Sequence, residues 1–336
     1  EQLIYEIGDP QAYYLPDVVC DFASVTLHEE SSNRVLVRGA KGYPATDKYK
    51  VSATYLDGYR ATYTQLVSGF DVVEKTQITA ERILERCKEL FASIGYSDFR
   101  QSSISLLGAN ALWNKDIVQT PDNLLEVVLR IAVHHDKREA TALFSREVMG
   151  VILNMTGGRC AAGAAGRPKV SPVINLYSFL LSKSKVTAMV DVDGQAVPFQ
   201  STNGEAFDYS RINREEAPLD SVSNEQTRKV QLIELAVARS GDKGDFANIG
   251  VIARKPEYMK YIAEAVTESS ISDWFAHILG GQVERFYLPG INALNFLMYD
   301  ALGGGGVGSM NIDVQGKTYA QQVLMMPIDI PVNLLD

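Results

Sequence analysis

Alternating apolar and polar residues predict that residues 17–66 are rich in β-strands. Two alternating runs between residues 24 and 39 are separated by a short polar stretch, and this spacing predicts a β-hairpin. Two further runs, 48–56 and 59–67, flank Asp57 and Gly58, a dipeptide that favours a tight turn, so we expect a second hairpin there. Threonine, tyrosine and valine dominate these runs, as is typical of strands.

A helical pattern follows, because apolar residues recur at three- and four-residue steps between Thr79 and Gly95. Thr79 is expected to cap the start of this helix and Gly95 to end it. The next segments predict, in turn, a buried strand, a strand or helix, a helix and a hairpin: 101–112, 122–133, 137–155 and 185–199. This succession predicts an α+β arrangement of layers.

The last third of the chain predicts a small domain of short strands and a few helices. The predicted strands are 230–238, 248–254, 283–289, 309–315 and 327–332, and the predicted helices are 257–267, 292–301 and 319–326. This mixture is typical of a ferredoxin-like two-layer sandwich. The polar, pattern-free residues 200–227 predict an interdomain linker. We therefore predict the α+β class, with a larger mixed α/β domain over residues 1–225 and a ferredoxin-like domain over residues 228–336.

Charge and composition narrow the classes of partner. The 336 residues carry a formal net charge of −9 at pH 7, and the resulting field repels nucleic acid and anionic membrane surfaces. The sequence contains neither a bilayer-spanning apolar stretch nor a secretory signal, so we expect a cytoplasmic protein that binds neither nucleic acid nor a membrane. The chain starts without Met, and its first residues already predict a strand, so we expect either a processed chain or a fragment of a longer protein.

Cysteine and histidine usage argues against a metal site. The three cysteines, Cys20, Cys87 and Cys160, are widely spaced, and we expect buried, reduced thiols. The four histidines form no spacing that is typical of metal ligands, so we expect no metal and the pattern names no cofactor. The adjacent His134 and His135 offer acid–base groups, but a structural role is favoured at this boundary between elements.

The stretch "ARSGDKGDFANIGVIAR", residues 238–254, concentrates charge and glycine between two apolar runs. Glycines allow backbone N–H groups to converge on an anion, and nearby cations add attraction, so we predict a ligand-binding loop. The predicted ligand-binding residues are Arg239, Ser240, Gly241, Lys243, Gly244 and Asn248, and the predicted acid–base residues are Asp242 and Asp245. The alternative is a charged hairpin whose ion pairs are internal.

Two further glycine-rich segments are candidates for anion binding. Four consecutive glycines, Gly303, Gly304, Gly305 and Gly306, allow close approach of the backbone to a ligand, or they form a flexible turn. We predict that they converge with the 238–254 motif. The segment 156–169 combines glycines with Arg159, Arg167 and Lys169, and is either an anion site or a surface loop.

Three stretches resemble the acyclic terpene utilisation (AtuA-like) family. They are the 238–254 motif, "LIYEIGDPQAYYLPDVVCDF" at residues 3–22, and "DALGGGGVGSMNIDVQGKTYAQQVL" at residues 300–324. The resemblance implies a larger domain followed by a ferredoxin-fold domain, and it implies that this chain corresponds to the C-terminal portion of family members. Only Gly157 and Gly158 of the middle segment carry over as ligand-binding residues.

The resemblance implies a place in the catabolism of acyclic terpenes by way of branched acyl-CoA intermediates. Combined with the cationic motif, it predicts an enzyme, or part of one, that binds a carboxylate or an acyl-CoA ester in a lyase- or hydratase-like reaction. The alternative is a non-catalytic subunit that binds a CoA ester or a partner protein. A homo-oligomer remains open.

Overall fold

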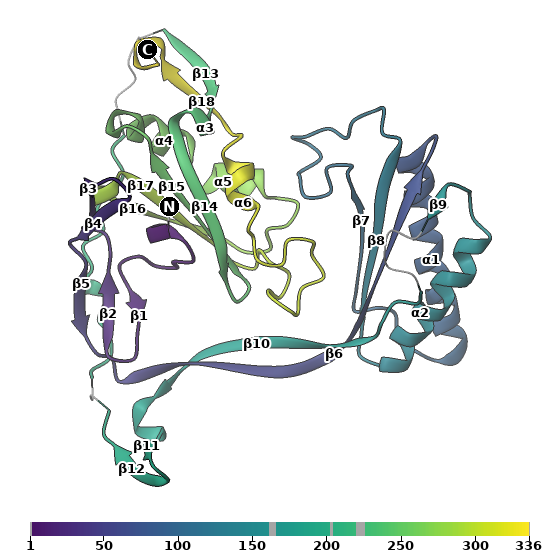
Figure 1. Ribbon diagram of the computed structural model, residues 1–336, viewed down its shortest axis with the longest axis horizontal. Coiled ribbons are helices and arrows are strands. Elements are labelled where there is room, and N and C mark those ends of the chain that lie inside the picture. The colour runs from purple at the N-terminus through teal and green to yellow at the C-terminus, as the bar shows by residue number, and fades with distance from the viewer. Residues whose placement is uncertain (1, 161–165, 202–203, 220–225, 336) are drawn as a thin grey trace. The chain divides into compact units, whose positions relative to one another are not determined.

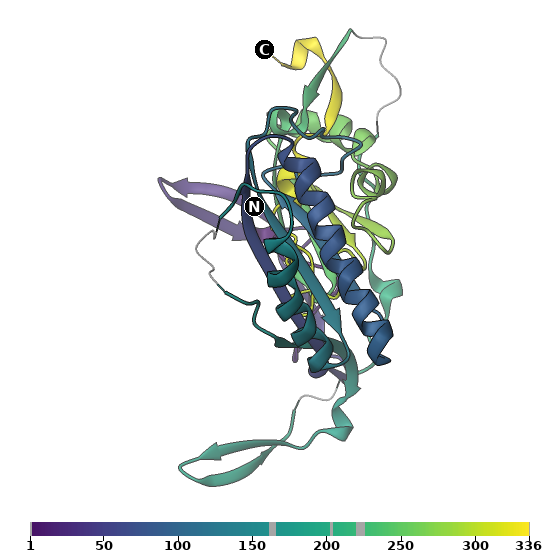
Figure 2. The same cartoon turned by 90° about the vertical axis from the view of Figure 1, so that its right-hand side faces the viewer.

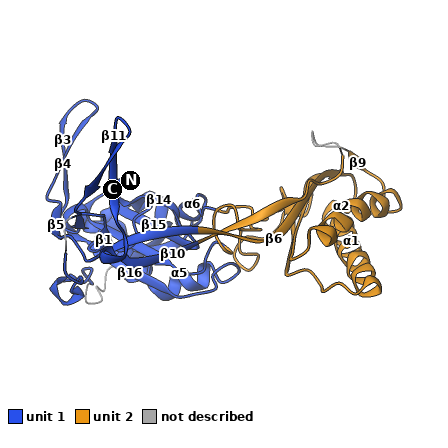
Figure 3. Ribbon diagram, turned by 90° about the horizontal axis from the view of Figure 1, so that it is seen from below, with its two compact units in different colours: residues 1–53, 177–302, 315–336 blue, residues 54–176, 303–314 orange. Residues whose placement is uncertain are grey.

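The computed structural model describes residues 2–160, 166–201, 204–219 and 226–335 (Figure 1). It confirms the predicted α+β class, because its sheets are antiparallel and its helices form separate segments. The chain divides into two compact units, each assembled from segments that are distant in sequence (Figure 3). Unit 1 comprises residues 1–53, 177–302 and 315–336, and unit 2 comprises residues 54–176 and 303–314.

The core of unit 1 is a four-stranded antiparallel sheet in the order β14-β15-β17-β16. Its strands are β14 (Ala236–Lys243), β15 (Phe246–Ala253), β16 (Val283–Leu288) and β17 (Ala293–Met298). The helices of this region are α3 (Leu232–Leu235), α4 (Met259–Ala265), α5 (Glu268–Trp274) and α6 (Tyr319–Val323). Helices α4 and α5 connect β15 to β16, and α6 follows β17. In the sheet, β17 lies between β15 and β16. These connections and this strand order are those of a ferredoxin-like fold.

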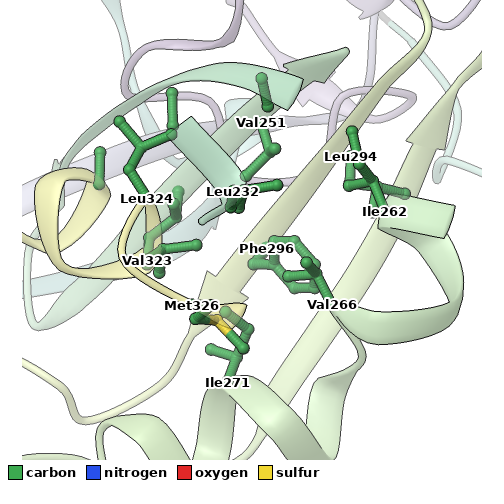
Figure 4. Packing of buried hydrophobic residues seen from close by; sticks show 14 of the residues in the cluster. Leu232, Val251, Ile262, Val266, Ile271, Leu294, Phe296, Val323, Leu324 and Met326 are labelled. Carbon is green, nitrogen blue, oxygen red and sulfur yellow. The ribbon is translucent and has the colours of Figure 1, made fainter. Parts of the chain in front are cut away.

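Alternate residues of β15 and β17 face two different partners. Ile249, Val251 and Phe296 belong to the main core cluster, which also contains residues of α4, α5 and α6 (Figure 4). The residues between them on these strands face the N-terminal segment, where Ile4 packs with Ala293 in a smaller cluster. The sheet is therefore covered on both faces, and every residue of β17 is buried.

Smaller sheets complete unit 1. They are β1 (Tyr13–Tyr14) with β2 (Val18–Asp21) and β5 (Lys41–Pro44), β3 (Thr26–Ser31) with β4 (Arg34–Arg38), β11 (Ala188–Val192) with β12 (Gln195–Phe199), and β13 (Thr227–Gln231) with β18 (Pro327–Pro331). The structure confirms the predicted hairpins at β3–β4 and β11–β12.

Unit 2 is a sheet in the order β10-β6-β8-β7, with β9 also paired to β6. Its elements are β6 (Lys48–Ser68), α1 (Val72–Ile94), β7 (Gln101–Leu107), β8 (Glu126–His135), α2 (Arg138–Leu153), β9 (Arg159–Cys160) and β10 (Ser171–Ser182). Helices α1 and α2 lie side by side over one face of this sheet (Figure 2). Apolar residues of the two helices, such as Ile83 of α1 and Phe144 of α2, pack with buried strand residues such as Ile131 of β8. Strands β6 and β10 continue from one unit into the other.

The predicted turn at Asp57-Gly58 is wrong, because β6 runs unbroken through both residues. Gly58 has a φ of +84°, and a Cβ atom there would lie 2.7 Å from the backbone oxygen of His135. The glycine therefore serves a close approach to the neighbouring strand, which a sequence cannot distinguish from a turn.

Helix α1 starts earlier than predicted. It begins at Val72, so Thr79 lies inside the helix and donates its hydroxyl to the backbone oxygen of Lys75 at 2.7 Å. The predicted end is confirmed, because Gly95 adopts the left-handed conformation and closes the helix.

Three predicted elements near the C-terminus are also wrong. The predicted helix 292–301 is the strand β17, because a strand buried on both faces loses the alternation that would identify it. The predicted strand 230–238 is interrupted by the single turn of α3. The predicted strand 309–315 forms no regular strand.

The described part of the predicted linker belongs to unit 1 and packs against residues of the N-terminal segment. Phe207 contacts the rings of Tyr14 and Tyr43, and Arg214 forms an ion pair of 2.6 Å with Asp9. Residues 202–203 and 220–225 of this segment lie outside the described residues. The predicted domain boundary falls there, whereas the compact units join residues 1–53 to the C-terminal segments.

Candidate functional site

The 238–254 motif forms the β14–β15 hairpin rather than a long loop, and it holds the N-terminal segment of the chain. Asn248, which is 1% exposed, accepts a hydrogen bond from the backbone N–H of Glu6 and donates to the backbone oxygen of Ile4, both at 2.8 Å. It also donates to Asn295 Oδ1 at 2.8 Å. Asn295 in turn donates to the backbone oxygens of Ile7 and Gly8. Two buried amides thus satisfy an irregular segment that forms no ladder with the sheet.

The glycines of the motif make room for this segment. A Cβ atom on Gly250 would lie 2.3 Å from Ile4 Cδ1, and one on Gly241 would lie 2.5 Å from Glu6 Cγ. Neither glycine has a positive φ. Both glycines therefore allow close packing and do not serve an unusual backbone conformation.

Charged side chains gather where Glu6 reaches β14. Lys243 Nζ lies 3.2 Å from Glu6 Oε2, and Lys317 Nζ lies 2.6 Å from Glu6 Oε1. Lys317 also lies 3.1 Å from Asp242 Oδ1. Both lysines are therefore paired with a carboxylate of the chain itself.

An aromatic ring completes this arrangement. The guanidinium of Arg239 lies 4.2 Å from the ring centroid of Tyr5, and the ammonium of Lys317 lies 4.6 Å from it. The Glu6 cluster is our name for Tyr5, Glu6, Arg239, Asp242, Lys243 and Lys317. These residues contribute three cations and two carboxylates, which leaves one excess positive charge among them.

Glu6 and Lys317 keep their charges over a wide pH range. Burial alone would raise the pKa of Glu6, but hydrogen bonds from Lys317, Tyr5 and Lys243 outweigh it and lower this pKa to about 2. Burial alone would lower the pKa of Lys317, but its bonds to Glu6, Tyr5 and Asp242 raise it instead. Both groups are therefore ionised at neutral pH.

Protonation of Glu6 in acid should lower the free energy of unfolding. Because its pKa is about 2 in the folded chain against an ordinary value of 4.5, its stabilising contribution is present above pH 4.5 and is lost as the pH falls towards 2. The side chain is 30% exposed, so we expect about 1–2 kcal/mol after allowing for solvent screening. Urea unfolding at pH 7 and pH 3 should show that Glu6→Gln loses this part of the pH dependence. Glu264→Gln, an exposed carboxylate of the same unit, should leave the pH dependence unchanged; an equal change in both variants would contradict the assignment.

A family model described as "Acyclic terpene utilisation family protein AtuA" matches residues 1–192, and one described as "AtuA ferredoxin-like domain" matches residues 230–329. The chain belongs to the AtuA family. The ferredoxin-like domain expected from the resemblance is confirmed. The restriction to a C-terminal portion was too narrow, because the main AtuA model also matches. No curated protein and no solved structure matches the chain.

All three stretches that carried the AtuA resemblance contact one another in the Glu6 cluster. Tyr5 and Glu6 come from the 3–22 stretch, and the β14 residues come from the 238–254 motif, while Lys317 comes from the 300–324 stretch. Sequence reasoning missed Tyr5, Glu6, Lys317 and Asn295 as members of the site. Their place inside the three resembling stretches was the signal that could have found the first three.

Other predicted residues of the motif hold the fold together. Ser240 is 2% exposed, and its hydroxyl donates to the backbone oxygen of Gly316 at 2.6 Å and accepts from the N–H of Ala320 at 2.9 Å. Asp245 Oδ1 accepts from the N–H of Leu302 at 3.1 Å. Gly244 has a φ of +69° at the hairpin turn.

The four-glycine segment groups with unit 2, whereas the β14–β15 hairpin belongs to unit 1. All four glycines, Gly303, Gly304, Gly305 and Gly306, have positive φ angles. Arg60 and Arg130 donate to the backbone oxygens of Ser309 and Met310 at 3.3 and 2.9 Å and so hold this segment against the unit 2 sheet. A common site with the 238–254 motif stays a prediction.

The third glycine-rich segment has a structural contact at Gly158. Its φ is +88°, and a Cβ atom there would lie 2.1 Å from the backbone oxygen of Ser68, whose N–H bonds to the Gly158 oxygen. A Cβ atom on Gly157 would meet no atom within 4 Å. Residues 161–165 of this segment lie outside the described residues.

Histidines and cysteines occupy ordinary structural positions. His135 is fully buried against Phe91, and its Nδ1 accepts from the N–H of Lys137 at 2.8 Å. Cys87 is buried, which raises the pKa of its thiol to about 12, whereas Cys160 is exposed, contrary to prediction. Among the described residues, the acidic, histidine and cysteine side chains form no metal-binding group, and none of the helices described is long and apolar enough to cross a membrane.

Proposed function

We propose that this AtuA family protein binds a small carboxylate or an acyl-CoA ester of acyclic terpene catabolism at the Glu6 cluster. The observation that carries the proposal is that Lys243 and Lys317 already hold one carboxylate, that of Glu6, while their side chains remain 31% and 36% exposed. The excess positive charge of the cluster favours a further anionic group. A ligand carboxylate or thioester carbonyl would meet the exposed sides of these two ammonium groups.

In the enzymatic form of the proposal, Asp242 is the acid–base group. Its carboxylate would take the proton from the carbon next to the thioester carbonyl, and Lys243 would stabilise the negative charge that develops on the carbonyl oxygen. In the lyase direction, a leaving group then departs from the neighbouring carbon. In the hydratase direction, water adds to the neighbouring carbon of an unsaturated ester, and protonated Asp242 would return a proton to the carbon next to the carbonyl. Arg239 and Tyr5 would position the ligand, and Asp245 would act by fixing the hairpin.

A non-catalytic binding subunit is the second candidate, and a specific observation favours it. The pKa of Glu6 is held at about 2 and that of Lys317 is raised, so both groups stay charged at neutral pH. Such groups hold an anion well, but they exchange protons poorly.

Calorimetric titration with citronellate, acetyl-CoA and free CoA tests the binding. We expect at least one ligand to bind, and the double variant Lys243→Ala, Lys317→Ala to bind it at least about tenfold more weakly, because two charge-assisted contacts are lost. Lys255→Ala is the matched control, since Lys255 also lies over a tyrosine ring, 5.3 Å from the centroid of Tyr258, but outside the cluster.

Failure of all three ligands to bind would contradict the proposal, and so would unchanged binding by the double variant. Hydrogen–deuterium exchange at the carbon next to the thioester separates the two candidates. Asp242→Asn should abolish such exchange and retain binding if the protein is an enzyme. If wild-type protein binds the ester and promotes no exchange, the non-catalytic candidate is favoured.

A further inference from the structure

A polar cavity of about 170 Å³ lies in unit 1, apart from the residues of the Glu6 cluster. Strands β2, β5 and β16 contribute to its wall, together with residues 211–215 from the middle of the predicted linker. The lining residues that carry chemistry are Gln11, Asp21, Lys41, Tyr43, Arg211 and Glu215. At this size the cavity has room for several water molecules or for a ligand of roughly six non-hydrogen atoms.

The most buried charge in this wall is Asp21, which is 7% exposed. Its Oδ1 accepts from the backbone N–H of Ala23 at 2.9 Å, and its Oδ2 has the Tyr43 hydroxyl at 3.5 Å, the outer limit of a hydrogen bond. Among the ion pairs of the described residues, none includes Asp21. A buried carboxylate without a cation is costly, so a hydrogen-bond donor or a cation brought by a ligand would stabilise it.

Two cations border the same cavity with incomplete partners. Lys41 Nζ donates to the neutral hydroxyl of Ser24 at 3.2 Å, and Arg211 approaches Asp208 only to 3.9 Å. Both side chains therefore retain capacity for a carboxylate. The wall thus offers a buried acceptor on Asp21 and two cationic donors.

The phenols of the wall are donors at neutral pH. Burial, followed by the charge of Asp21, raises the pKa of Tyr43. Burial, followed by the charge of Glu215, raises the pKa of Tyr287, which also lines the cavity. Gln11 is 5% exposed and is fixed by its donation to the backbone oxygen of Asn213 at 3.1 Å, so the wall is organised before any ligand arrives.

We propose that the Asp21 cavity binds a small acid that carries both a carboxylate and a neighbouring hydroxyl or ammonium group. The carboxylate meets Arg211 and Lys41, and the hydroxyl or ammonium donates to Asp21. A plain carboxylic acid satisfies only the first half of this arrangement. An α-hydroxy acid and an α-amino acid share the required chemistry, and the two differ in the charge that they bring to Asp21.

The test is titration of the whole protein with lactate, alanine and propionate, followed by NMR or calorimetry. We expect lactate or alanine to bind in a saturable manner, and propionate, which lacks the second donor, to bind at least tenfold more weakly. Arg211→Ala, at the exposed rim, should weaken every acid that binds. Asp21→Asn should reduce alanine binding more than lactate binding, because an amide accepts from a hydroxyl but does not neutralise an ammonium.

Asp17→Asn is the matched control, because Asp17 is an exposed carboxylate four residues away on the same segment. It should bind all three acids as the wild type does. The proposal is overturned if none of the acids saturates, if propionate binds as tightly as the other two, or if Asp17→Asn and Asp21→Asn behave alike. The double variant Lys243→Ala, Lys317→Ala should leave lactate and alanine binding unchanged, so failure here is distinguishable from failure of the Glu6 cluster.

Discussion

Replacing Asn248 by alanine is expected to lower the free energy of unfolding by about 3–5 kcal/mol. The Asn248 amide is 1% exposed and makes three hydrogen bonds, to the backbone of Ile4, the backbone of Glu6 and the side chain of Asn295. Alanine removes all three and leaves their buried partners without a replacement, which costs more than the bonds themselves contribute. Urea unfolding monitored by circular dichroism measures the change.

The same substitution should release the N-terminal segment. Limited proteolysis of Asn248→Ala should therefore cut within residues 2–8 faster than in the wild type. Asn333→Ala is the control, because Asn333 is exposed, and its free energy of unfolding should change by less than about 0.5 kcal/mol. A small effect of Asn248→Ala on both measurements would mean that the hydrogen bonds of Asn248 do not hold the N-terminal segment on the sheet.

Replacing Phe296 by alanine is expected to lower the free energy of unfolding by about 3–5 kcal/mol. The ring is fully buried at the centre of β17 and packs in the cluster formed with α4, α5 and α6 (Figure 4). Its removal loses apolar burial and leaves a cavity between the sheet and the helices, which cannot collapse fully. The midpoint of urea unfolding should fall accordingly.

Phe199 provides the matched control for this change. Its side chain lies on β12 and is 57% exposed, so Phe199→Ala should alter the free energy of unfolding by less than about 0.5 kcal/mol. If the two variants lost similar stability, the packing of β17 between two layers would be contradicted.

Local signals in the sequence predicted those elements whose two sides differ. The helix that ends at Gly95 and the hairpins β3–β4 and β11–β12 were predicted, because one face is apolar or because a turn residue sets the register. The strand β17 was mistaken for a helix, because both of its faces are buried and its residues do not alternate. Gly58 was mistaken for a turn residue, because only the neighbouring strand explains its conformation.

The ligand-binding role of residues 238–254 stays a prediction. The structure shows that Lys243 of this motif pairs with the carboxylate of Glu6. No local pattern indicates that Lys243 pairs with Glu6, which lies more than two hundred residues earlier. Ion pairs between distant segments depend on the path of the chain and not on local pattern.

The sequence by itself determined the α+β class, the ferredoxin-like domain and the family, because these follow from local periodicity and from stretches of recognisable residues. Only the tertiary structure decided the roles of the charged and polar residues. It made Asn248 and Asn295 the residues that hold the N-terminal segment, and it placed Asp21 as a buried acid beside a cavity. The reason is physical, since burial and partners fix what a polar group does, and both arise from residues far apart in the chain.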